Sequence, residues 1–243
     1  MSVSKVSGIE YQILHRGTFA MLQVGLKRSE MFQAEAGAMV CMSDTIELHG
    51  HMDNFYDAAM RRIAGESFMF QRYRARDNGV LFLAPAMPGD IAVLEMDGSE
   101  DFKLTRNAYM ASTPNIRIQA NPLQAGNVSM GNLIGNRLNC PILMNVSGRG
   151  TVFMSSCGAI SCIELKDSEE LIVDNGHMVA WPSFMRVEIG RAQESSDSGN
   201  FMKDIANSYF SGEGLVYRAF GPGKLYFQSR NIDGTREFIK SFL

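Results

Sequence analysis

The turns KRSEM (27–31), DGSED (97–101) and KDSEE (166–170) decide how this sequence is read. Their Ser-Glu pairs lie 70 and 69 residues apart, and each turn separates two apolar-rich segments. A period of this length overrides local assignments, because it marks one structural unit that recurs along the chain. The sequence therefore predicts three copies of one unit.

The segments around the turns are of the same type in each copy. Short apolar runs with the length and composition of strands precede the turns: AMLQVGL (20–26), IAVLEM (91–96) and ISCIEL (160–165). The segments after the turns carry a methionine at corresponding places, each behind a small or turn-forming residue: Met39, Met110 and Met178. A strand, a bend and a second strand are expected there.

Two more strands are expected later in each copy. The third strand opens at the glycines Gly65, Gly135 and Gly212. The fourth strand follows a tight turn, in NGVLFLA from Asn78, RGTVFMS from Arg149 and PGKLYFQ from Pro222. Glycines at these turns can supply the positive φ that a hairpin requires: Gly79, Gly150 and Gly223.

One piece without strand character precedes the third strand of each copy. Helical spacing of apolar residues favours short helices at Asp53–Ala64 and Asn200–Phe210, and less clearly at Asn121–Leu133. These helices are interpreted as caps over open barrel ends, with docking to a partner or a membrane as the alternative. Thr235–Leu243 is either a short amphipathic helix packed on the body or an arm that reaches a neighbouring subunit.

The predicted fold is all-β, with sandwich or double-stranded β-helix-like units in three pseudo-symmetric repeats and short helical insertions. The repeats span residues 18–88, 89–157 and 158–231, with a C-terminal extension over 232–243. Because neighbouring repeats bury surface against one another, residues 1–243 are expected to form a single composite domain.

Composition restricts the class of protein. The chain has 243 residues, 45% of them hydrophobic and 20% charged, and a net charge of −3. This charge gives no attraction to a phosphate backbone and argues against DNA binding. Neither a signal peptide nor a transmembrane segment is evident, so we expect a cytoplasmic protein. The cysteines are interpreted as small buried hydrophobes: Cys41, Cys140, Cys157 and Cys162.

Six strings of residues are informative as a set: AEAGAMVCM, AGESFMFQRY, LAPAMPGDI, GRGTVFMSSCGAI, LIVDNGHMVAW and GEGLVYRAFGPGKLYFQSRN. Together they resemble a bacterial and archaeal family related to the mitochondrial-biogenesis (altered inheritance of mitochondria) proteins, within the TRAP-like superfamily. The resemblance runs from about Gly17 to Asn231. It implies TRAP-like β-sandwich units, a homo-oligomer and no established enzyme activity. The basic residues are scattered among acids, so RNA binding by superfamily analogy is the weaker alternative.

Few residues suggest chemistry. His49 and His51 would point the same way from a strand and can start a metal site, or they lie in a solvated loop. His177 follows Asp174, which can orient its imidazole, so a catalytic dyad is the alternative to a structural turn. Three glutamates that can bind a cation or tie down turns are Glu35, Glu66 and Glu213.

No set of residues completes a catalytic, cofactor or metal site, so none is assigned and no cofactor is expected. The methionines fall mostly inside expected strands, where they fill a core or form an exposed partner surface. The leading functional hypothesis is a non-enzymatic homo-oligomer that acts as a scaffold or binding module. The alternative is a protein that binds a small ligand or metal between repeats, and hydrolase chemistry at His177 is a weaker one.

Overall fold

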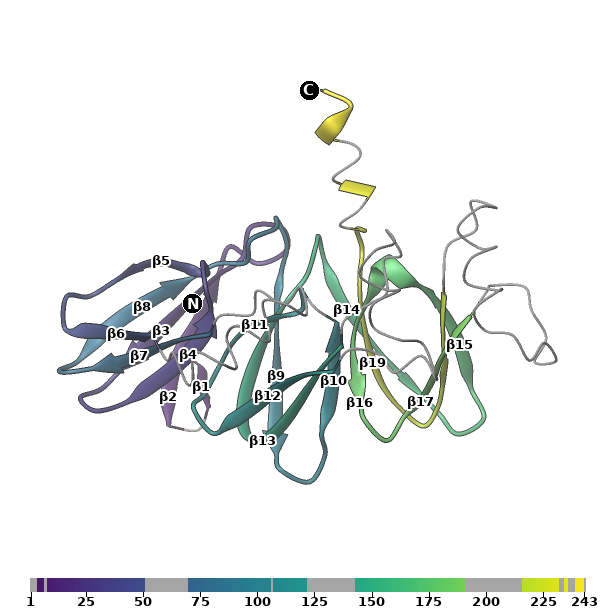
Figure 1. Ribbon diagram of the computed structural model, residues 1–243, viewed down its shortest axis with the longest axis horizontal. Coiled ribbons are helices and arrows are strands. Elements are labelled where there is room, and N and C mark those ends of the chain that lie inside the picture. The colour runs from purple at the N-terminus through teal and green to yellow at the C-terminus, as the bar shows by residue number, and fades with distance from the viewer. Residues whose placement is uncertain are drawn as a thin grey trace, which may run out of the picture.

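The computed structural model describes residues 4–6, 8–50, 70–105, 107–121, 143–190, 216–231, 234–235 and 239–242 (Figure 1). Within these residues the regular structure is nearly all β, with strands paired antiparallel in sheets of five, eleven and three strands. The predicted all-β class is confirmed. No helix in the described ranges has the length and apolar character needed to cross a membrane.

The first group of strands forms two packed sheets, β1-β2-β3-β8-β5 and β4-β7-β6. Alternation along β3 buries Leu22 and Val24, which pack with Phe32 and Leu81 in one core. The bounds are β1 Ser4–Val6, β2 Ile9–Leu14, β3 Met21–Leu26, β4 Met31–Glu35, β5 Met39–Met42, β6 Ile46–Gly50, β7 Phe70–Ala75 and β8 Gly79–Leu83.

The second group is built around one long strand, β13, whose 13 residues serve two sheets. Residues 143–148 pair with β12, and residues 149–155 pair with β9. Leu104, Tyr109 and Met144 lie in the core of this group. The bounds are β9 Ile91–Asp97, β10 Phe102–Thr105, β11 Tyr109–Ser112, β12 Ile116–Asn121 and β13 Leu143–Ser155.

The third group has the same two-layer arrangement, with β14-β19-β16 in one sheet and β15-β18-β17 in the other. Its core contains Trp181, Tyr217 and Leu225. The bounds are β14 Ile160–Leu165, β15 Glu170–Asp174, η1 Asn175–His177, β16 Met178–Pro182, β17 Arg186–Gly190, β18 Val216–Phe220 and β19 Gly223–Gln228.

Neighbouring groups are joined by strand pairing, and Figure 1 shows the three groups side by side in a row. β4 of the first group pairs with β11 of the second, and β10 of the second pairs with β16 of the third. These two joints carry the eleven-stranded sheet through all three groups.

Backbone segments also meet where the groups adjoin. Isolated parallel bridges link Phe19 to Gly89 and Gly89 to Gly158. A Cβ atom on Gly89 would lie 1.7 Å from the carbonyl oxygen of Ser156, so only glycine allows this approach.

The predicted strands before the turns are confirmed as β3, β9 and β14, and those after them as β4–β5, β10–β11 and β15–β16. The predicted hairpins are wrong. β7 and β8 follow each other but lie in different sheets, as do β18 and β19. In the second group no turn intervenes, because Gly148 (φ 105°) and Gly150 (φ 156°) let β13 pass from one sheet to the other.

Three β-bulges show which residues of the three groups correspond, and they correct the predicted correspondence of the methionines. They lie at Val40, Met110 and Val179, which are 70 and 69 residues apart, as the Ser-Glu pairs are. Met39, Tyr109 and Met178 therefore correspond, and the predicted equivalence of Met110 is wrong by one residue. Met110 and Met178 are buried, whereas Met39 is exposed.

Of the cysteines, Cys157 is buried as expected, but Cys41 and Cys162 are exposed. Both exposed cysteines lie on strands at the end of a sheet, where no further strand covers them in the described part. The three predicted helices fall outside the described residues, apart from Asn121 at the end of β12, and Cys140 falls outside them too. Figure 1 shows the described C-terminal pieces leading away from the strands, and Ile239 and Phe242 are largely exposed there.

Candidate functional site

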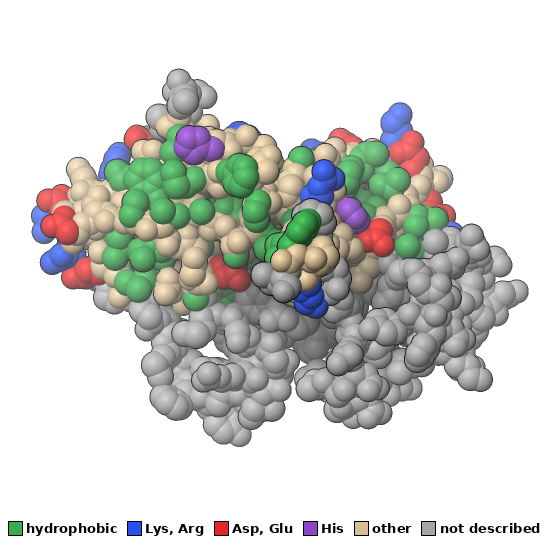
Figure 2. Space-filling view, turned by 90° about the horizontal axis from the view of Figure 1, so that it is seen from above, with side chains coloured by type: hydrophobic (Ala, Val, Ile, Leu, Met, Phe, Trp, Pro, Cys, Tyr) green, Lys and Arg blue, Asp and Glu red, His purple; other side chains and the backbone are tan. Residues whose placement is uncertain are grey.

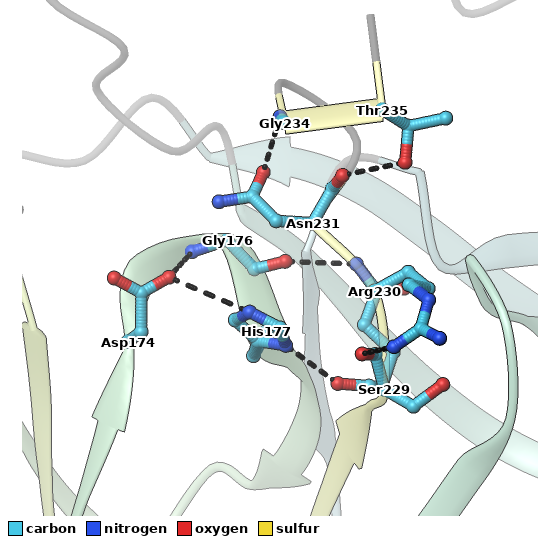
Figure 3. A network of polar contacts seen from close by, with 9 residues as sticks. Asp174, Gly176, His177, Ser229, Arg230, Asn231, Gly234 and Thr235 are labelled. Carbon is cyan, nitrogen blue, oxygen red and sulfur yellow. Dashed lines mark hydrogen bonds and ion pairs between the residues drawn. The ribbon is translucent and has the colours of Figure 1, made fainter. Parts of the chain in front are cut away.

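His177 is held in a turn at the end of the third group (Figure 3). Its Nδ1 lies 2.8 Å from the carbonyl oxygen of Gln228, which can only accept a hydrogen bond. The ring therefore donates from Nδ1. Nε2 lies 4.0 Å from Oδ1 of Asp174, which accepts instead from the backbone N–H of Gly176 at 2.9 Å.

Gln228 is the centre of this network. Its side-chain Nε2 donates to the carbonyl oxygen of Gly176 at 2.9 Å, and its Oε1 accepts from the backbone N–H of Cys157 at 2.8 Å. Gln228 is buried, so each of these bonds replaces one that water cannot make there. The residue ties the η1 turn to the segment that joins the second and third groups.

The same backbone position is used differently in the other groups. The residue directly before the strand that carries the bulge is Ala38, Ala108 or His177. The carbonyl oxygens of the two alanines accept hydrogen bonds from the backbone N–H groups of Ala84 and Ser155. In the third group the imidazole contacts the Gln228 carbonyl instead. His177 thus has a structural hydrogen bond at a place where the other groups need no side chain.

The Asp174–His177 pair has the residue types of an acid–base dyad, but its geometry is that of a fastened turn. Cys157, whose Sγ lies 3.7 Å from the Thr235 hydroxyl oxygen, contacts the C-terminal segment. The Thr235 hydroxyl donates to the carbonyl oxygen of Asn231 at 2.8 Å. These contacts fasten the chain that leaves β19.

The remaining predicted candidates are not brought together in the described residues. His49 lies in β6 and Glu35 ends β4, whereas His51, Glu66 and Glu213 lie outside the described ranges. Within those ranges, no group of three His, Cys, Asp or Glu side chains is placed to hold a metal ion.

Burial raises the pKa of several tyrosines, among them Tyr109 and Tyr226. It raises the pKa of Tyr109 above its ordinary value, and the Tyr109 hydroxyl lies 3.0 Å from Oγ of Ser112. Burial, with the neighbouring Cys162 thiol as the second cause, raises the pKa of Tyr226 to about 12. Both phenols stay protonated at neutral pH and serve as packing groups with a hydrogen-bonding end.

An apolar surface is the clearest candidate site for interaction. Figure 2 shows hydrophobic side chains gathered on the face over the first group of strands, where β5 lies. In β5 the exposed fractions of Met39 and Val40 are 39% and 53%. Ile172 in β15 is exposed at the other end of the row.

The sequence interpretation missed Gln228, and it gave an exposed methionine surface as an alternative without singling out β5. Gln228 carries no motif, and its partners lie 51 to 71 residues away. In β5 the run MVCM is apolar at four successive positions, which indicates a strand covered on both faces, and nothing in the run shows that this cover is missing.

Comparisons with known proteins place the chain. The model of the family described as "Mitochondrial biogenesis AIM24" matches residues 11–230. A protein of Streptococcus pyogenes serotype M6, described as uncharacterized, is 25% identical over 233 residues, which are 93% of this chain and 87% of that protein.

Two further comparisons give a fungal relative and a solved structure. The Altered inheritance of mitochondria protein 24, mitochondrial, of Verticillium alfalfae is 24% identical over 74% of this chain, which spans less than half (45%) of the fungal protein. A crystal structure of a Streptococcus pyogenes protein covers 97% of this chain and all of its own, with a TM-score of 0.75 and 22% identity. That structure shows the same fold.

Proposed function

Because this chain belongs to the Mitochondrial biogenesis AIM24 family, and because its most suggestive polar groups serve structure, we propose that it is a non-enzymatic, homo-oligomeric scaffold or binding module. The network around His177 supports this proposal, since its hydrogen bonds fasten a turn and a chain crossing. The mitochondrial role in the fungal relative's name is not part of the proposal, since this chain covers less than half of that protein.

The observation that carries the proposal is the apolar side chains exposed on and beside strands. Met39 and Val40 lie on β5, and Ile172 lies on β15. Apolar side chains exposed at the edge of a sheet mark a place that another protein surface can cover. An exposed strand without charged side chains also invites strand pairing between chains. A scaffold that assembles from identical copies accounts for both.

We also infer that the three groups are TRAP-like repeats, with boundaries at residues 18–88, 89–157 and 158–231 in one composite domain. The three bulges support this inference, because they lie 70 and 69 residues apart along the chain. The residues joined by the parallel bridges are separated by the same two distances in sequence. Repeats joined by strand pairing suit a scaffold, since the same joint can be used again. A cytoplasmic location and the small-ligand and RNA hypotheses stay predictions.

Light scattering coupled to size-exclusion chromatography tests the oligomer directly. The chain has a mass of 26.9 kDa, so an assembly of identical copies gives a multiple of this value at micromolar concentration. The mass should rise with concentration or hold at one multiple. A mass of one chain across the whole concentration range would overturn the proposed function.

A further inference from the structure

The two joints inside the molecule use the same strands in the same register. At the first joint Ala34 pairs with Ala111, and Gln33 pairs with Ser112. At the second joint Leu104 pairs with Ala180, and Lys103 pairs with Trp181. Each residue of the second joint lies 70 or 69 positions after its counterpart in the first. The joint is therefore one repeated interface, made by the edge strand of one group and the bulged strand of the next.

Each half of this interface occurs once more at an end of the row, where no other strand of the described residues pairs with it. The bulged strand of the first group is β5, which lies at the end of the five-stranded sheet. The corresponding edge strand of the third group is β15, which lies at the end of the three-stranded sheet. Figure 1 shows β5 and β15 at opposite ends of the molecule.

Exposure shows what the joint normally covers. Tyr109 and Met110, and likewise Met178 and Val179, are at most 2% exposed at the internal joints. Their counterparts in β5 are Met39 and Val40, with exposed fractions of 39% and 53%. In β15 the residue that corresponds to Gln33 is Ile172. The side chain of Gln33 is 6% exposed at the first joint, whereas Ile172 is 45% exposed.

We propose that β15 of one copy pairs with β5 of a second copy, in the register of the internal joints. Val173 then lies opposite Cys41 of the second copy, and Ile172 lies opposite its Met42. This inference rests on the proposed homo-oligomer and names its interface. The occupant is a second copy because the chain itself carries both halves of the joint.

The side chains at the two ends are suited to this contact. β5 consists of Met39, Val40, Cys41 and Met42, so it lacks the charges and prolines that usually block pairing at an exposed edge. At the first internal joint the side chain of Gln33 donates to Oγ of Ser112 at 2.8 Å. The corresponding pair between copies, Ile172 and Met42, replaces this hydrogen bond with an apolar contact.

The proposed contact is head-to-tail, since it joins two different surfaces. Such an interface generates a closed ring when the rotation per step closes and an open chain when it does not. A single discrete mass in solution therefore indicates a ring, and a broad distribution that grows with concentration indicates an open chain. Either result is compatible with pairing of β15 with β5.

Cysteine cross-linking between two different variants tests the register. In a background with Cys41, Cys140 and Cys162 replaced by serine, one protein carries Ile172→Cys and the other Met42→Cys. Opposite residues on antiparallel strands have the Cα separation that a disulfide accepts. Under mild oxidation we expect a disulfide-linked dimer in the mixture and at least tenfold less in either variant alone.

The matched control is a mixture of Ile163→Cys with Met42→Cys. Ile163 is a similarly exposed isoleucine, on β14 rather than β15. Equal cross-linking in this control mixture, or in Ile172→Cys alone, would overturn the proposed register. Absence of any cross-link in the mixture of Ile172→Cys with Met42→Cys would overturn it as well.

A second pair of variants tests the interface without cysteines. Val40→Asp places a charge where the joint buries its counterparts, and Leu48→Asp places one on the exposed side of β6 in the same group. We expect Val40→Asp to reduce the assembly to the mass of one chain, and Leu48→Asp to leave the assembly intact. The far-UV circular dichroism spectra of both variants should equal that of the native protein. If the native protein is an oligomer that Val40→Asp does not dissociate, this interface is wrong while the proposed oligomer stands. A native monomer would remove both.

Discussion

Gln228 shows how one buried side chain can hold the end of a β-sandwich together. Its amide contacts the backbone of Gly176 and of Cys157, and its own carbonyl oxygen contacts His177. The turn and the crossing segment thus depend on a single residue. In the sequence, His177 stands out because of its chemistry, whereas Gln228 does not. The histidine needs partners that only the folded chain brings near it.

Replacing Gln228 with methionine should destabilise the protein strongly, although the two side chains are of similar size. Methionine makes neither amide hydrogen bond, so the buried N–H of Cys157 and the partly buried carbonyl of Gly176 lose their partner. Each unsatisfied group costs about 1–3 kcal/mol, so we expect a loss of about 2–4 kcal/mol in urea unfolding. The control is Gln23→Met, at a half-buried position on β3. A similar loss in both variants would contradict the role of Gln228.

At the scale of an element, the Ser-Glu turns show that similar sequences can adopt different backbone geometries. In the first and third groups Glu30 and Glu169 accept from the backbone N–H of Lys27 and Lys166, both at 2.7 Å. Ser29 and Ser168 have φ of 71° and 67° in these turns.

The second group forms its turn otherwise. Gly98 takes the positive φ there, and Asp97 accepts from the N–H of Ser99 at 2.8 Å. The hydrogen bonds from Ser99 lower the pKa of the Asp97 carboxyl. The Ser-Glu motif predicted all three turns correctly, but only the first and third turns have the same geometry. In the second turn Gly98, one residue before the serine, reverses the chain in another way.

Ser168→Gly should stabilise the protein. A non-glycine residue in the left-handed region costs about 1–2 kcal/mol, and the added freedom of glycine in the unfolded chain offsets part of the gain. We expect an increase of about 0.5–1 kcal/mol in the free energy of unfolding, measured with urea. At the corresponding position of the second group, Ser99→Gly should destabilise, because it removes the side-chain hydrogen bond to Asp97. Changes of the same sign in both variants would be inconsistent with these turn geometries.

At the scale of the whole molecule, three cores are joined by two strand pairings. The eleven-stranded sheet connects the groups, and the parallel bridges at Gly89 bring their backbones together. Phe153 of the second group packs in the core of the first, where its ring lies 5.0 Å from that of Tyr11. Loss of one core therefore exposes part of the next, and we expect the groups to unfold together.

Leu22→Ala tests this coupling across the full length of the row. Leu22 is fully buried in the first core, so its truncation should cost about 2–5 kcal/mol. The single tryptophan, Trp181, lies in the third core and reports on it by fluorescence. Fluorescence and far-UV circular dichroism should give one coincident transition, shifted equally by the substitution. A tryptophan transition that stays in place while circular dichroism shifts would show that the groups unfold independently.

The sequence by itself determined the β class and the strands around the three Ser-Glu turns, because alternation, turn chemistry and a 70-residue period are local or regular signals. The family was recognised separately, from strings of residues that resemble it. Only the tertiary structure decided which strands pair, where β13 crosses between sheets, and which apolar strands are covered. β5, β11 and β16 have similar sequences, yet β11 and β16 are buried at joints and β5 is exposed. Exposure depends on a neighbour from elsewhere in the fold, and no strand carries that information in its own residues.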